Sequence, residues 1–68
     1  MFEDEEERIR QKIHELKLEH RALDVAVRSL LEGVYVDQLQ LRRLKKRKLA
    51  LKDLIRRLQS ELIPDLDA

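Results

Sequence analysis

The sequence contains no cysteine and no tryptophan, and only one each of glycine, proline, tyrosine and phenylalanine among its 68 residues. Without cysteine, disulfide bonds and thiolate zinc ligands are excluded. No apolar run approaches the roughly 20 residues of a membrane span, and the acidic start, MFEDEEE, is unlike a signal peptide. We therefore expect a cytoplasmic protein with no cofactor and no membrane segment.

The short length limits the core that the chain can build. A chain of 68 residues is one domain at most, and so small a core leaves little stability after the conformational entropy of folding is offset. Charged and hydrophobic residues each make up 43% of the sequence, a composition typical of long helices and coiled coils. Because disulfide bonds and thiolate zinc sites are excluded, we expect a second chain to supply the additional stability.

The net charge of +1 conceals an uneven distribution along the chain. Residues 1–32 contain nine acidic and six basic residues, whereas residues 33–58 contain two acidic and nine basic residues. The last ten residues add three acidic side chains and no basic one. The two halves of the chain therefore attract each other before either attracts a partner.

Apolar residues recur at alternating spacings of three and four in both halves of the chain, which defines two heptad seams. The seam positions are Phe2, Ile9, Ile13, Leu16, His20, Leu23, Val27, Leu30 and Val34 in the first half, and Leu41, Leu44, Lys48, Leu51, Ile55, Leu58 and Leu62 in the second. Two seams of similar length predict an all-α protein, an antiparallel two-helix hairpin. We expect two such hairpins to form a four-helix bundle as a homodimer.

Local signals mark the connection between the helices. Gly33 can adopt the left-handed conformation that ends a helix, and Asp37 can cap the next helix. Gln40 would complete a capping box, and Val36 and Leu41 are spaced for a hydrophobic staple. These signals predict one domain over residues 1–68. Its expected parts are helix one at about 3–32, a turn at 33–36, helix two at about 37–63, and a frayed tail at 64–68 after Pro64.

Two polar residues, His20 and Lys48, occupy seam positions. If the chain turns about residues 34 and 35, facing residues have numbers that add to about 69, which places His20 opposite Lys48 or Leu49 and Asp24 opposite Lys45. We expect an inter-helix polar cluster that penalises a slipped register. Its members are His20, Asp24, Lys45, Lys48 and Lys52.

The same cluster allows two alternative interpretations. His20 and Asp24 share a helix face and could ligate a metal, but His14 projects elsewhere and a closed site would need a second chain. A His–Asp pair could also act in acid–base catalysis, yet the sequence offers no accompanying nucleophile or glycine-rich loop. We therefore predict no catalytic or metal site.

The stretch RRLKKRK, residues 42–48, holds six basic residues within seven. On a helix, its charged side chains would spread over the solvated face. They could also bind phosphates in a salt-dependent way, although the two aromatic residues are far from the cluster. The candidate phosphate-binding residues are Arg42, Arg43, Lys46 and Arg47.

A second apolar set lies away from the seam of helix one. It consists of Leu18, Ala22, Val25 and Ser29, and helix two adds Leu39 and Leu49 off its own seam. Single exposed aliphatic residues are common and need no function. Because the core is too small to stand alone, we instead interpret the first four residues as a self-association surface, with small residues at a close helix crossing.

Two motifs resemble the small bacterial YdcH-like family, whose function is unknown. HRALD, residues 20–24, matches the family pattern H-x-x-L-D, and LKKRKLALKDLI, residues 44–55, matches L-K-K-x-K-L-x-L-K-D-E-I. The similarity extends from Leu16 to Leu58, and Leu54 departs from it by standing where the family has Glu. The resemblance implies a bacterial helical hairpin with no assigned activity.

Together these observations favour a non-catalytic interaction and assembly module that forms a homodimer. They leave open a further partner protein of unknown identity. The alternative is a small nucleic-acid-associated protein that uses the basic face of helix two. An enzyme is the least favoured class.

Overall fold

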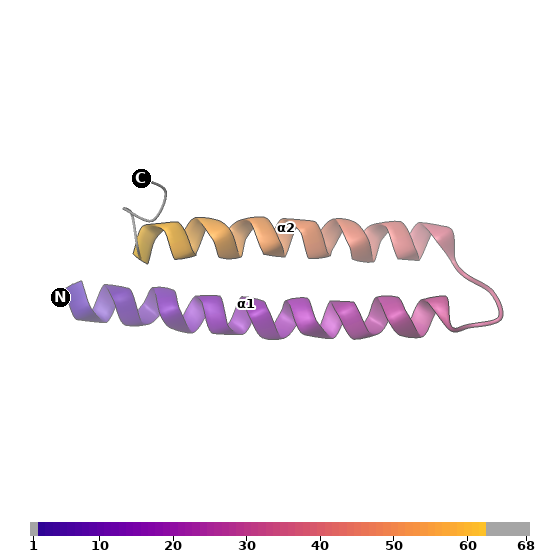
Figure 1. The fold of residues 1–68 in the computed structure, drawn as a ribbon, viewed down its shortest axis with the longest axis horizontal. Helices are drawn as coiled ribbons and strands as arrows, with labels where there is room; N and C mark the ends of the chain where they lie inside the picture. The colour runs from indigo at the N-terminus through magenta and orange to yellow at the C-terminus, as the bar shows by residue number, and fades with distance from the viewer. Residues whose placement is uncertain (1, 63–68) are drawn as a thin grey trace.

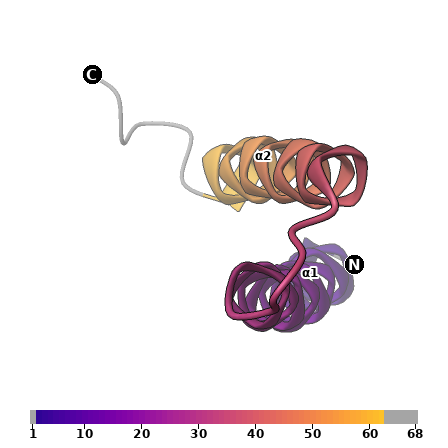
Figure 2. The same cartoon turned by 90° about the vertical axis from the view of Figure 1, so that its right-hand side faces the viewer.

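The computed structural model describes residues 2–62, which form two α-helices joined by a short connection. Helix α1 spans Phe2–Leu31 and helix α2 spans Gln38–Leu62. The helices run side by side in opposite directions, with the connection at one end of the molecule (Figures 1 and 2). No strand occurs among these residues. The predicted all-α hairpin is confirmed, whereas the tail at 64–68 and the effect of Pro64 lie outside the described residues.

The core is one line of apolar side chains between the two helices. Its buried members are Ile13, Leu16, Val27, Leu41, Leu51 and Ile55, and Ile9, Leu23, Leu58 and Leu62 pack against them partly buried. All ten are seam positions, because the three-and-four spacing keeps these side chains on the face that meets the other helix. Leu51 is the most deeply buried, with 1% of its surface exposed.

Val34 does not extend this line. Its side chain is 97% exposed. Helix α1 ends at Leu31, so the helical periodicity that assigned residue 34 to the seam does not continue that far. The apolar three-and-four pattern in the sequence therefore continues for one seam position beyond the end of the helix.

The end of α1 differs from the prediction made for Gly33. No residue of the described chain, glycine included, has a positive φ angle, so Gly33 does not adopt the left-handed conformation. The N–H of Gly33 donates to the carbonyl of Leu30 at 3.3 Å, which closes a tight last turn. A Cβ added at Gly33 would lie 3.3 Å from the Tyr35 carbonyl oxygen and 3.4 Å from that of Leu30. Close backbone approach, and not handedness, distinguishes this glycine.

Asp37 caps the start of α2. Its Oδ1 accepts hydrogen bonds from the N–H groups of Leu39 and Gln40, each at 3.1 Å, and its carbonyl accepts from Leu41 at 2.9 Å. These bonds satisfy donors that a helix N-terminus leaves unpaired. Val36, just before the cap, is half-buried, and Leu41 is buried. The chain therefore enters α2 at a residue whose side chain fixes the helix start.

The hairpin is elongated and exposes a large surface for its size. Its radius of gyration is 15.5 Å, whereas a compact domain of this length has about 11 Å. Its accessible surface is 6163 Å², whereas a compact monomer of this mass has about 4,500 Å². The two-helix arrangement thus exposes roughly 1,600 Å² more than a compact monomer would, about twice the area that one partner buries in a standard protein interface.

Candidate functional site

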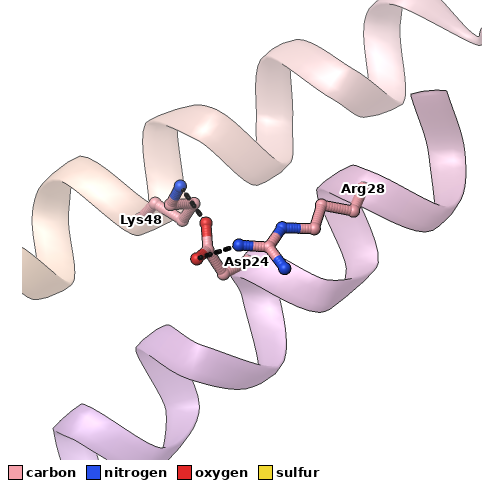
Figure 3. A network of polar contacts seen from close by, with 3 residues as sticks. All are labelled: Asp24, Arg28 and Lys48. Atoms are coloured by element: carbon pink, nitrogen blue, oxygen red, sulfur yellow. Dashed lines mark hydrogen bonds and ion pairs between the residues drawn. The ribbon is translucent and has the colours of Figure 1, made fainter.

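One ion pair joins the two helices across the edge of the core. The Nζ of Lys48, on α2, donates to Oδ1 of Asp24, on α1, at 2.5 Å (Figure 3). The guanidinium of Arg28, one turn further along α1, lies 3.9 Å from the other carboxylate oxygen. The side chain of Lys48 starts from a seam position and is only 27% exposed.

The pKa of Asp24 is held below its ordinary value of 3.8. The hydrogen bond from Lys48 is the largest cause, and the positive charge of the same ammonium is the next. Partial desolvation opposes this effect, and the charges of Arg28 and His20 add smaller lowering contributions. The carboxylate is therefore ionised at neutral pH and is matched by Lys48.

The other members of the predicted cluster, His20, Lys45 and Lys52, are not part of this ion pair. His20 is half-buried and, together with Asp24 and Lys52, lines a hollow between the helices. Lys45 is exposed and makes no ion pair with any residue from 2 to 62. The lysine that meets Asp24 is thus Lys48, one helical turn beyond the one that the register arithmetic placed opposite it.

A second ion pair between the helices was not predicted from the sequence. Both Nε and Nη2 of Arg47 donate to Oε2 of Glu19, at 3.1 and 2.8 Å. These residue numbers add to 66 and those of Asp24 and Lys48 add to 72, values that lie evenly about the expected 69. A search for opposite charges within one turn of the expected register would have found both pairs.

The candidate phosphate-binding residues divide into two groups. Arg47 is engaged by Glu19, although its side chain remains 57% exposed. The side chains of Arg42, Arg43 and Lys46 are exposed and have no carboxylate partner within residues 2–62. Three of the four are therefore solvated cations on the outer surface of α2.

The predicted self-association surface lies in solvent. Leu18 and Val25 are 52% and 59% exposed, and Ala22 and Ser29 between and beyond them are also exposed. We call these four residues the α1 stripe. The other large exposed apolar side chains are Leu31, Val34, Tyr35, Leu39, Leu49 and Leu54. The α1 stripe is the set in which exposed apolar and small residues succeed one another along one helix face.

The described residues form no metal centre and no membrane helix. Within residues 2–62, no group of three histidine, cysteine or acidic side chains comes together in a way that could hold a metal ion. The carboxylate of Asp24, the ligand that the metal interpretation required, faces Lys48. Neither α1 nor α2 combines the length and apolar character needed to cross a bilayer.

These features define a heptad-packed helical hairpin with a single apolar seam and ion pairs on its edges. A family described as protein of unknown function (DUF465) matches residues 13–59, and the chain belongs to this family. YdcH-like proteins belong to it as well, so the resemblance found in the sequence is confirmed. Neither the curated proteins nor the solved structures contain a match. The match covers the six buried core residues and both inter-helix ion pairs.

Proposed function

We propose that the chain is a non-catalytic assembly module in which two hairpins pair through the α1 stripe and form a four-helix bundle. The observation that carries this proposal is the exposure of Leu18 and Val25, at 52% and 59%, in a protein that buries only six apolar side chains among its described residues. Covering the α1 stripe removes apolar surface from water, which is the main favourable contribution to association.

The surface area of the hairpin supports the same proposal. The accessible surface of 6163 Å² exceeds that of a compact monomer of equal mass by roughly 1,600 Å². A standard interface covers about 800 Å² on each partner, so one pairing would remove about half of that excess. The small side chains of Ala22 and Ser29 allow the two α1 helices to approach closely where they cross.

Sedimentation velocity of charge-inserted variants tests this proposal. We expect the double variant Leu18→Lys/Val25→Lys to sediment as a monomer, because two ammonium groups per chain would be buried at the interface. The matched control is Leu49→Lys, which changes a 69% exposed leucine on α2 outside the α1 stripe. The control should keep the mass of the wild type. Equal masses for the double variant and the wild type would contradict the proposal.

A second candidate function is the binding of a nucleic-acid backbone by the outer surface of α2. Arg42, Arg43 and Lys46 are exposed and form no ion pair within the part of the chain that the structure describes, which favours this candidate because such cations can contact phosphates. Retention on heparin tests this candidate. It predicts that Arg42→Gln/Arg43→Gln elutes at lower salt than Arg57→Gln/Arg56→Gln, which removes the same charge nearer the other end of α2. Coelution would contradict it.

A further inference from the structure

A hollow of about 310 Å³ lies between the two helices, beside the Asp24–Lys48 pair. It is lined from α1 by Lys17, His20, Arg21 and Asp24, and from α2 by Lys52 and Ile55. We call it the inter-helix groove. Ile55 is 9% exposed and His20 is half-buried, whereas Lys17, Arg21 and Lys52 are exposed. The groove therefore has an apolar and imidazole floor beneath a cationic rim.

The groove carries an unbalanced positive charge. Lys17, Arg21 and Lys52 form no ion pair with any carboxylate of residues 4–62. The one acid on the rim, Asp24, is already matched by Lys48, which approaches to 2.5 Å. Cations held near one another without a counter-charge repel each other, and an anion placed among them relieves that repulsion.

We propose that the inter-helix groove binds a small polyphosphate anion, with inorganic triphosphate as its simplest representative. Arg21 supplies the planar fork that matches phosphate oxygens, and Lys17 and Lys52 approach from opposite helices as point charges. The ring N–H of His20 adds a donor at the floor. This is a different location from the basic run of residues 42–48, because only one of the groove's lysines comes from α2.

The dimensions of the groove favour a compact ligand. Its volume of about 310 Å³ is at the lower end of small-molecule sites. A nucleic-acid backbone follows an extended row of cations, whereas the groove gathers three Lys and Arg side chains around one hollow. We therefore assign the phosphate groups to a short polyphosphate and make the nucleic acid an alternative outcome of the test.

Part of the groove borders the α1 stripe. Arg21 lies three residues after Leu18 and four before Val25, so its side chain neighbours theirs on the surface of α1. Asp24, by contrast, is turned toward Lys48 of α2. This inference does not rest on the proposed function, and the two can fail separately.

Isothermal titration of the full chain with sodium triphosphate, at fixed ionic strength, tests the inference. We expect Arg21→Gln and Lys52→Gln each to weaken binding about tenfold, the loss that follows from removing one charge-assisted hydrogen bond. The matched control is Lys46→Gln, which removes the same charge from an exposed site outside the groove. It should change the affinity less than twofold. Glutamine favours helix, so circular dichroism should show unchanged helicity in all three variants.

Three results would overturn the inference. The first is no heat of binding at millimolar triphosphate. The second is an equal loss in Lys46→Gln and Lys52→Gln, which would indicate a diffuse attraction to net charge. The third is tighter binding of a single-stranded oligonucleotide than of triphosphate at equal phosphate concentration, with a larger effect of Lys46→Gln than of Arg21→Gln. That result would assign the phosphates to the outer surface of α2.

Discussion

Replacing Leu51 by alanine tests how strongly the single seam holds the hairpin together. Leu51 is 1% exposed and is the most deeply buried side chain of the core. The substitution removes three carbon atoms from the interior, which corresponds to roughly 2.4 kcal/mol at about 0.8 kcal/mol per buried methylene. The residual cavity adds to this figure, although two helices without a third layer can move together and partly close it. We expect a total loss of about 3 kcal/mol in the free energy of unfolding.

The matched control is Leu49→Ala on the same helix. Leu49 is 69% exposed, so the same atoms are only about one third removed from water, and the expected loss is about 0.8 kcal/mol. Urea unfolding followed by the helical circular dichroism signal at 222 nm measures both values under one set of conditions. Equal losses for Leu49→Ala and Leu51→Ala would refute the assignment of the core to the seam.

Three further predictions concern the ion pair, the helix cap and the turn. Asp24→Asn should lower the melting temperature more than Asp53→Asn does, because Asp53 pairs only locally with Arg57, at 3.6 Å. Since folding lowers the pKa of Asp24, the unfolded chain binds more protons at this carboxylate than the folded chain does. The stabilisation is complete above pH 3.8 and declines as the pH falls below it, a decline that Asp24→Asn should lack. Asp37→Ala should cost about 1 kcal/mol in urea unfolding, through loss of the cap. Gly33→Ala should cost less than about 1 kcal/mol in urea unfolding, because φ is not positive there and the added Cβ would meet the carbonyl oxygens of Tyr35 and Leu30 at 3.3 and 3.4 Å; a larger loss would contradict this backbone conformation.

The hairpin could be predicted from the sequence because one repeating pattern determines it. A three-and-four spacing places Ile13, Leu16, Leu51 and Ile55 on facing helix surfaces whatever the neighbouring residues are. The start of α2 was equally predictable, since the oxygen of Asp37 reaches the N–H groups two and three residues ahead through local geometry alone.

The contacts that the sequence did not determine depend on shifts smaller than one helical turn. The register was right on average, but Asp24 could reach a lysine on either side of the expected position, and it meets Lys48. To predict that Glu19 pairs with Arg47 would have required the register to be known with the same precision. At Gly33, the residue type permits a positive φ without requiring it, and the backbone uses a tight last turn instead.

The inter-helix groove was also beyond the reach of the sequence. His20, Asp24 and Lys52 were expected near one another as a register device, whereas the part played by Lys17 and Arg21 follows only from the side on which the helices meet. That side depends on how the two seams are rotated against each other. Spacing within one helix does not specify this rotation.

We propose that the hairpin works as an assembled module, and its molar mass in solution distinguishes a dimer from a monomer. Size-exclusion chromatography with light scattering, on protein purified without high-salt washing, gives that mass together with the absorbance at 260 nm. The chain has no tryptophan and one tyrosine, so bound nucleic acid would dominate the absorbance. We expect a single species at twice the chain mass of 8.2 kDa with little absorbance at 260 nm. A monomer that carries strong, salt-labile absorbance at 260 nm would contradict the claim and favour the nucleic-acid candidate.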